Sequence, residues 1–265
     1  MVKYLRALPL YKELIHMRKI GLQLYSIKEL TQKDFIGTLR QVAETGYDGV
    51  EFAGFFDTPA KELKKALEDF GLECCGSHTG INLLTDNLQE TLDYNLEIGN
   101  PYIICPGVPE AMRNSADAFK RLAELFNEIG LKCKEQNLQF GYHNHAHEFN
   151  VYDGQWGLDI LLSNTDPELV QMELDTFWAE YAGVRSIDFM NKYPKHCSTL
   201  IHIKDMKSED ERVNTEIGNG IIDFVAITKL AKDLGIKWYI VEQEQFDKPQ
   251  LESIGQSLQY LKKIL

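Results

Sequence analysis

The sequence predicts a single α/β domain folded as a (β/α)8 TIM barrel, with its active site at the C-terminal ends of the strands. Short apolar runs alternate with amphipathic segments throughout the 265 residues, and such a barrel needs about 250 residues. The competing arrangement, a doubly wound open sheet, requires a Gly-rich phosphate turn after its first strand. The first run, LQLYSIKEL, is followed by no such turn, so the barrel is favoured.

Eight segments are predicted to form the strands. Each is a nearly continuous apolar run that becomes polar towards its C-terminal end, as expected of parallel strands that are covered on both faces. In chain order they are 20–27, 49–53, 72–78, 102–107, 138–145, 170–177, 199–206 and 238–244.

The segments between the strands carry helix signals. Thr31 is expected to start the first helix, with Asp34 at the capping-box position and Gly46 at its end. Pro59 opens the next helix, and Gly71 ends it. Two further amphipathic helices are expected at 114–136 and 222–235. Signals between the sixth and seventh strands, and after the eighth, are weaker.

Residues 1–17 precede the first strand and are expected to be an N-terminal extension, so that residues 18–265 form the barrel. Lys12, Glu13 and His16 interrupt the apolar stretch of this extension, and no small-residue cleavage site follows. A signal peptide is therefore not expected. No apolar run approaches the roughly 20 residues of a membrane span, so we expect a cytoplasmic protein without a membrane partner.

The net charge and the cysteine content argue against a nucleic-acid-binding protein and against a fold held by disulfides or a zinc ribbon. The net charge is −12 and no run rich in Lys or Arg occurs, which argues against a nucleic-acid partner. The five cysteines include the adjacent pair Cys74 and Cys75 but no CxxC spacing. They therefore indicate reduced cytoplasmic thiols rather than disulfides or a zinc ribbon. If the chain self-associates, a homodimer is the default form.

Ionisable and polar residues gather at the predicted C-terminal ends of the strands. The segment GYHNHAHEF, residues 141–149, holds three of the histidines. Strand ends converge on one face of a barrel, and buried carboxylates are costly unless they are paired or bind a metal. We therefore expect a divalent cation there, with a structural ion-pair network as the alternative. The residues are Gln23, Glu51, His78, His143, His145, Glu148, Glu173, Asp175, His202, Lys204, Asp205, Glu242 and Glu244.

An ordered set of motifs resembles the xylose-isomerase-like barrel superfamily, which includes sugar isomerases and epimerases, inosose dehydratases and endonuclease IV. The resemblance covers almost all of residues 18–265. GLQLYSI and YHNH are most similar to the bacterial sugar phosphate isomerase/epimerase family. The other motifs are GSHTG (76–80), ELDTFWAEYAG (173–183), IHIKDMKS (201–208), IGNGIIDF (217–224) and VEQE (241–244).

The resemblance implies one divalent metal ion held by Asp175, His202 and Glu242. The family usually supplies a fourth ligand from a Glu at the end of strand five, where this chain reads YHNH. Glu148 is favoured as the substitute, because three carboxylates and one imidazole suit Mn²⁺, Mg²⁺ or Co²⁺. The alternative, His143, would shift the preference towards Zn²⁺, Fe²⁺ or Mn²⁺.

The predicted activity is that of a metal-dependent carbohydrate isomerase or epimerase that removes a proton next to a carbonyl and forms an enediolate. Glu242, His143 and His145 are the candidate proton carriers, and Lys204 is the candidate for stabilising oxyanion charge. The candidate substrate-binding residues are Gln23, Glu51, His78, Trp178 and Arg212.

Three other functions compete with this prediction. A lyase or dehydratase acting on an inosose or a 3-keto-glycoside is supported by YHNH, which resembles the inosose dehydratase pattern. A nuclease like endonuclease IV is disfavoured, because Trp178 stands where that enzyme has a further histidine. If the barrel only binds a ligand, chelation of metal ions should leave its ligand affinity and its stability unchanged. A phosphate group on the substrate is doubtful, because few Lys or Arg residues lie near the predicted mouth.

Overall fold

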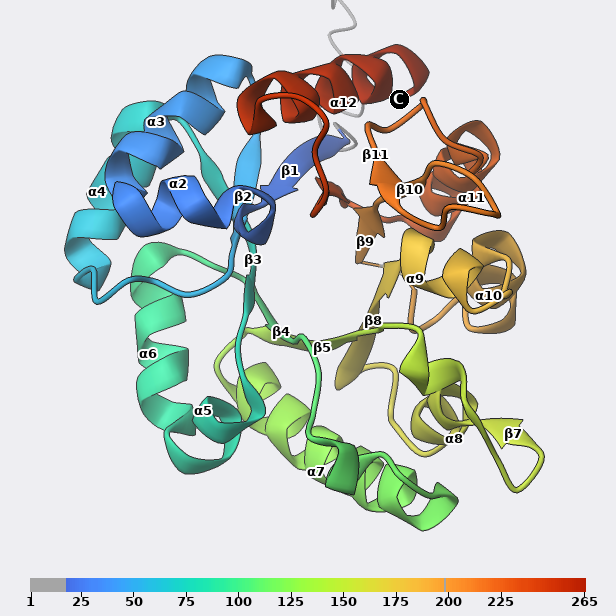
Figure 1. Ribbon diagram of the computed structural model, residues 1–265. Coiled ribbons are helices and arrows are strands. Elements are labelled where there is room, and N and C mark those ends of the chain that lie inside the picture. Colours follow the sequence, from blue (N-terminus) through green and yellow to red (C-terminus); the bar gives the residue numbers. More distant parts are fainter. Residues whose placement is uncertain (1–17, 198) are drawn as a thin grey trace, which may run out of the picture.

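The computed structural model describes residues 18–265, except for residue 198. The predicted N-terminal extension, residues 1–17, therefore lies outside the described residues. Within the described part, eight parallel strands close into a barrel in the order β1-β12-β9-β8-β5-β4-β3-β2. Helices surround the strands (Figure 1). The described helices are too short or too polar to cross a bilayer.

The barrel strands match the eight predicted segments, although several are shorter. They are β1 (Lys19–Gln23), β2 (Gly49–Phe52), β3 (Glu73–His78), β4 (Tyr102–Cys105), β5 (Gln139–His143), β8 (Val170–Asp175), β9 (Leu200–Ile203) and β12 (Trp238–Val241). Two short antiparallel pairs lie outside the barrel: β6 (Val151–Tyr152) with β7 (Gln155–Trp156), and β10 (Asp205–Met206) with β11 (Asn214–Thr215).

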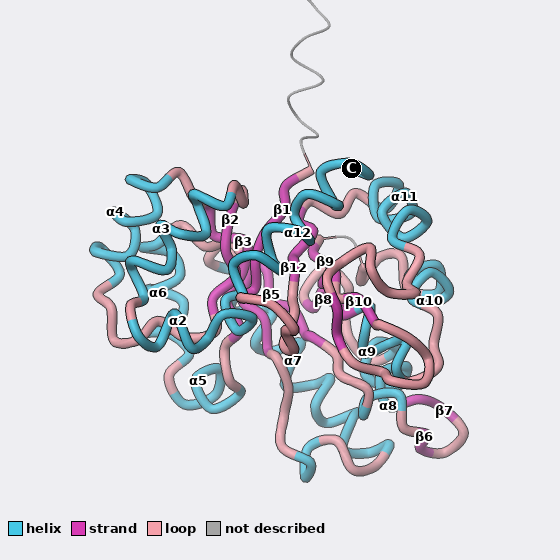
Figure 2. The backbone as a smooth tube through the Cα atoms, turned by 45° about the horizontal axis from the view of Figure 1, so that its top comes forward, coloured by secondary structure: helices cyan, strands magenta, loops and turns pink. Residues whose placement is uncertain are grey.

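Helical segments follow the barrel strands and pack around them (Figure 2). The α-helices are α2 (Lys28–Lys33), α3 (Phe35–Thr45), α4 (Ala60–Phe70), α5 (Ile81–Asp86), α6 (Leu88–Ile98), α7 (Ala116–Glu135), α8 (Gly157–Ser163), α9 (Thr176–Tyr181), α10 (Ser186–Lys192), α11 (Phe224–Leu234) and α12 (Gln250–Ile264). Three 3-10 turns are η2 (Leu24–Ile27), η3 (Glu110–Met112) and η4 (His147–Phe149).

The start of α3 differs from the prediction. Asp34, and not Thr31, is the N-cap, because its backbone is extended and its side chain accepts a hydrogen bond from Gly37 N at 2.9 Å. Thr31 lies within the separate helix α2. Gly46 ends α3 in the left-handed conformation, with φ of 101°, which glycine adopts without strain.

The barrel interior has an apolar layer and an ionisable layer. Cys75, Ile104, Trp238 and Ile240 belong to a buried cluster that is separate from the main core between strands and helices. A Cβ added to Gly21 would meet Cys75 Sγ at 2.5 Å, so this cluster fills the barrel between strands that are not neighbours. Towards the C-terminal ends of the strands the buried residues become Glu, Asp, His and Lys.

Candidate active site

A pocket of about 500 Å³ opens at the C-terminal ends of the barrel strands. Its wall combines ionisable side chains with apolar and aromatic ones, as in many small-molecule sites. The lining residues are Tyr25, Ala53, His78, Pro106, His143, His145, Trp178, Glu242 and Glu244.

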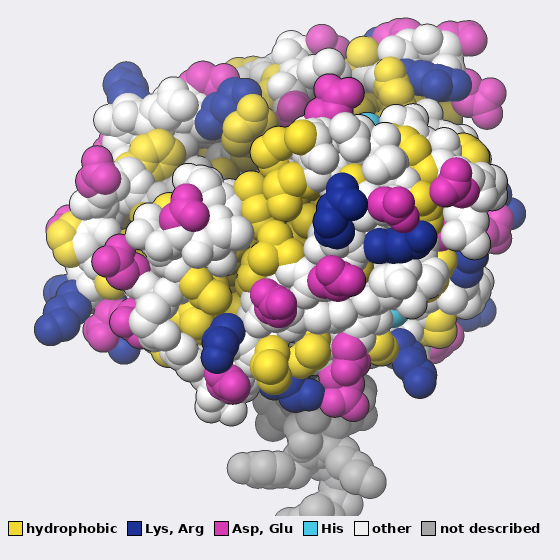
Figure 3. All heavy atoms as spheres, turned by 90° about the horizontal axis from the view of Figure 1, so that it is seen from below, with side chains coloured by type: hydrophobic (Ala, Val, Ile, Leu, Met, Phe, Trp, Pro, Cys, Tyr) yellow, Lys and Arg dark blue, Asp and Glu magenta, His cyan; other side chains and the backbone are white. Residues whose placement is uncertain are grey.

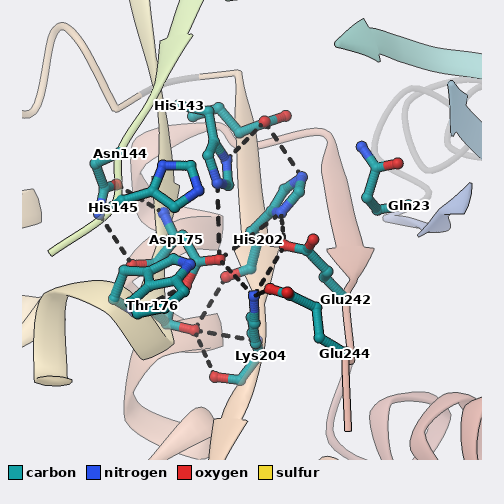
Figure 4. Close-up of polar contacts among 12 residues, drawn as sticks. Gln23, His143, Asn144, His145, Asp175, Thr176, His202, Lys204, Glu242 and Glu244 are labelled. Carbon is teal, nitrogen blue, oxygen red and sulfur yellow. Dashed lines mark hydrogen bonds and ion pairs between the residues drawn. The ribbon is translucent and has the colours of Figure 1, made fainter. Parts of the chain in front are cut away.

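Four buried side chains converge beneath this pocket: His143, Asp175, His202 and Glu242. One donor atom from each lies within 4.8 Å of the others. Figure 4 shows the four side chains pointing towards one another from separate strand ends. The contacts include His202 Nδ1 to Glu242 Oε2 at 3.0 Å and His143 Nε2 to Asp175 Oδ2 at 3.9 Å.

The local structure explains how Asp175 comes to face this group. It ends β8 and caps α9, because its Oδ1 accepts a hydrogen bond from Trp178 N at 3.0 Å. Asn144 also fixes the backbone of Asp175, accepting a hydrogen bond from its N–H at 2.9 Å. Oδ2 of Asp175 is buried and has no hydrogen-bond partner among the described residues. A carboxylate oxygen in that position is suited to bind a cation.

A second layer of ionisable residues orients the two histidines. His202 directs Nδ1 to Glu242 and Asp175, while its Nε2 lies 2.7 Å from Glu51 Oε2. His143 directs Nε2 to Asp175, while its Nδ1 lies 3.1 Å from Glu173 Oε2. A carboxylate that accepts one ring N–H leaves the other nitrogen free to bind a metal. The two imidazoles and two carboxylates therefore fit a divalent ion such as Zn²⁺, Fe²⁺ or Mn²⁺.

Crowding of acidic groups shifts their pKa values. Burial raises the pKa of Asp175 to about 7, with Lys204 opposing the shift. Burial and repulsion from Glu51 raise the pKa of Glu173 to about 7. Burial also acts to raise the pKa of Glu242, but Lys204 and His202 hold it below its usual value. A bound cation would favour the ionised form of all three carboxyls.

Lys204 supplies buried positive charge to this group. Its side chain is fully buried, and its Nζ lies 3.4 Å from Glu242 Oε2, 3.9 Å from Asp175 Oδ2 and against Glu244. The ammonium group also lies 5.1 Å from the ring centre of Trp178. Lys204 therefore balances carboxylate charge at the floor of the pocket.

Besides His143, two further histidines and one tryptophan from the predicted set lie in the pocket wall. His78 contacts Glu173 Oε2 through Nε2 at 2.9 Å, and its side chain is 11% exposed. His145 lies beside Trp178, with ring centres 5.5 Å apart. Trp178 Nε1 is buried and finds no hydrogen-bond partner in the described structure, so it is available to donate to a bound molecule.

Besides Asp175, His202 and Lys204, four residues of the predicted site do not line the pocket. Glu148, favoured by sequence as the fourth ligand, is not part of the group formed by His143, Asp175, His202 and Glu242. Its oxygens accept hydrogen bonds from Tyr142 Oη at 2.6 Å and from His145 N at 2.8 Å. The geometry therefore favours the alternative, His143. The other three residues are Gln23, Glu51 and Arg212.

Each of these three makes polar contacts within the protein. Gln23 donates from Nε2 to Glu51 Oε2 at 2.7 Å, and both residues are fully buried. In Figure 4 Gln23 stands apart from the four converging side chains. Arg212 lies on an exposed loop, where its guanidinium donates to Tyr181 O at 3.3 Å and stacks over the Tyr181 ring.

Sequence reasoning gave Glu173 no role, although Glu173 contacts His78, His143 and His202. Its signal was the alternation in MELD, which places Glu173 on the same face of the strand as Asp175. Tyr25 was also missed, and nothing in its sequence context marks it as a pocket residue.

Comparisons with known proteins agree with this fold. The model of the xylose isomerase-like TIM barrel family matches residues 39–264. An inosose dehydratase from Geobacillus kaustophilus is 27% identical over 247 residues, covering 78% of this chain and 79% of the relative. A second inosose dehydratase, from Clostridium beijerinckii, is 24% identical and covers 81% and 83%. A crystal structure of a sugar phosphate isomerase/epimerase from Parabacteroides distasonis superposes with a TM-score of 0.80. It is 29% identical and covers 92% of this chain and 93% of that one.

Proposed function

Because the chain belongs to the xylose isomerase-like TIM barrel family, we propose that it is a divalent-metal-dependent carbohydrate isomerase or epimerase. The observation that carries the proposal is the convergence of His143, Asp175, His202 and Glu242 beneath a pocket of suitable size. We assign these four residues as the metal ligands, with His143 in the place that the sequence had favoured for Glu148. A bound divalent ion would polarise a substrate carbonyl and acidify the neighbouring C–H group.

Two candidate proton carriers, Glu242 and His145, line the pocket. Glu242 is the proposed base on one side, because Lys204 and His202 keep its carboxylate ionised although burial opposes this by raising its pKa. His145 is the proposed carrier on the other side. Burial lowers the pKa of His145, so its neutral imidazole is able to accept a proton near neutral pH. Two carriers on opposite faces of a planar enediolate would suit proton removal from one face of a carbon and return to the other, which is epimerisation.

The pocket favours an uncharged carbohydrate. None of the described residues that line it is a lysine or an arginine, and Lys204 already faces Asp175, Glu242 and Glu244. A phosphate dianion would meet the carboxylates of Glu242 and Glu244 without a free cation to bind it. The Trp178 ring offers an apolar wall for the C–H face of a sugar. On the face shown in Figure 3, basic and acidic side chains are interspersed.

The second candidate function is dehydration of a keto-cyclitol or keto-sugar. Two relatives of the chain are inosose dehydratases, and dehydration of this kind begins with the same proton removal. Glu242 would take the proton next to the carbonyl and give it to the departing hydroxyl group, so that water leaves and the carboxylate is restored. The two candidate reactions diverge only after the first proton transfer.

The proposal is tested with enzyme loaded with Mn²⁺ in D₂O and a panel of unphosphorylated keto-sugars and inososes. We expect deuterium to enter the carbon next to the carbonyl of at least one substrate, detected by NMR. Glu242→Gln should reduce this exchange by about 100-fold or more while circular dichroism stays unchanged. Persistence of exchange in this variant would contradict the role of Glu242 as base, and loss of water from the substrate would identify a dehydratase.

A further inference from the structure

The segment 145–148, directly after β5, forms a second group of metal-binding donors. One ring nitrogen each of His145 and His147 and a carboxylate oxygen of Glu148 lie within 4.8 Å of one another. This group shares no residue with the four proposed ligands of the active site. Its members come from the end of GYHNHAHEF and the turn η4.

Two imidazole nitrogens of this group are buried without a hydrogen bond. They are His145 Nδ1 and His147 Nε2, and neither has a hydrogen-bond partner among residues 18–265 other than 198. His147 Nε2 makes an ion-pair contact with Glu148 Oε1 at 2.8 Å. Buried nitrogens of this kind cost free energy unless something else binds them.

Glu148 is a rigid and fully buried anion. Tyr142 Oη and His145 N donate to its two oxygens, so the carboxylate is held in one orientation. Among the described residues its only ion-pair contact is with His147. A cation held between the three side chains would balance this buried charge.

We propose that His145, His147 and Glu148 form a second divalent-cation site, selective for Zn²⁺ or a similar transition ion. Two imidazoles and one carboxylate are a donor set that zinc accepts, with the remaining positions filled by water. The His147 side chain is 32% exposed, which gives an ion access from solvent. Because His145 also lines the reaction pocket, an ion bound at Nδ1 would prevent that nitrogen from carrying protons.

Zinc titration of the metal-free full chain tests this proposal by equilibrium dialysis and calorimetry. We expect roughly two Zn²⁺ per wild-type chain, since each site has at least three donors. His147→Gln should bind one ion and keep the active-site ion, whereas Asp175→Asn should keep only the second ion. His196→Gln is the matched control, because this histidine lies elsewhere and contacts Thr165; it should bind as the wild type does.

Two results would overturn the proposal. If the wild type binds one Zn²⁺ and His147→Gln leaves its affinity unchanged, His147 and Glu148 form only an ion pair. If His147→Gln still binds two ions, the second ion lies elsewhere. An unchanged result for Asp175→Asn would instead count against the active-site assignment, so the two failures are distinguishable.

Discussion

At the scale of single residues, the histidines His143 and His202 connect the two layers of the site. Each directs one ring nitrogen to the proposed ligand group and the other to a buried carboxylate, Glu173 or Glu51. The carboxylates select the tautomer that leaves the metal-facing nitrogen unprotonated. Glu51 and Glu173 contact these histidines, which explains why both carboxylates are fully buried without lining the pocket.

Glu173→Gln should therefore weaken metal binding although Glu173 is not a proposed ligand. We expect the dissociation constant for Mn²⁺ or Co²⁺ to rise by about 10- to 100-fold, as for other carboxylates that orient a ligating histidine. Isothermal calorimetry measures the change, and the absorption spectrum of bound Co²⁺ reports whether the coordination is altered. Glu73→Gln is the control, because Glu73 pairs with Lys19 in a solvent-exposed contact. Equal affinities in both variants would contradict the orienting role.

The sequence identified most of the charged residues of the site. It did not show which of them are proposed ligands and which orient the ligating histidines. The alternation of strands placed Asp175, His202 and Glu242 at one mouth. The choice between His143 and Glu148 depended on the direction of the chain after β5, which periodicity does not report. Tyr142 and the backbone of His145 hold Glu148, and these contacts exist only in the folded chain.

At the scale of elements, the boundaries of strands decide which residues reach the site. β5 ends at His143 and β12 at Val241, so His145, Glu242 and Glu244 follow the strands rather than continue them. The sequence predicted longer strands, because the apolar runs extend into polar residues without a turn signal. It also gave no sign of the β6–β7 hairpin, whose strands have two residues each and too little periodicity to detect.

Gly76 of β3 shows how closely the strands approach the ionisable layer. A Cβ at this position would lie 2.4 Å from Glu51 Oε1, so Gly76→Ala must displace the buried Glu51 carboxylate. We expect a loss of about 1–3 kcal/mol in the free energy of unfolding, measured in urea, as for other overpacked sites.

The control for this substitution is Gly255→Ala in α12. Its added Cβ would meet Thr45 Cγ2 at an ordinary 3.6 Å, and alanine favours helix over glycine by about 0.5–1 kcal/mol. This variant should therefore be slightly more stable than the wild type. If Gly76→Ala were equally stable, the position of Glu51 would not depend on close contact with β3.

At the scale of the whole molecule, the barrel was predictable because most strand–helix units repeat the same pattern. Apolar runs, helix caps and stop glycines such as Gly46, Gly71 and Gly235 recur along the chain. Closure into a barrel followed from the number of units and from the lack of a phosphate-binding turn. The division of the barrel interior into an apolar layer and an ionisable layer was not predictable, because it depends on contacts between strands far apart in sequence.

The five cysteines should be unreactive in the folded protein, since all are buried and free. Burial raises the pKa values of Cys105, Cys133 and Cys197 to about 12, whereas an unfolded thiol ionises near ~8.5. The protonated, buried thiols therefore contribute fully to the free energy of unfolding below pH ~8.5. This contribution is lost as the pH rises towards 12. We expect a disulfide reagent at pH 8 to modify the thiols only after denaturant is added. A thiol that reacts at once in the native protein would contradict this packing.

The central claim is that His143, Asp175, His202 and Glu242 hold one divalent ion at the mouth of the barrel. Anomalous diffraction from crystals grown with Mn²⁺ tests it most directly. We predict a peak within about 2.0–2.3 Å of His143 Nε2, Asp175 Oδ2, His202 Nδ1 and a Glu242 oxygen. A peak coordinated by Glu148 in place of His143, or no peak among these four side chains, would contradict the claim.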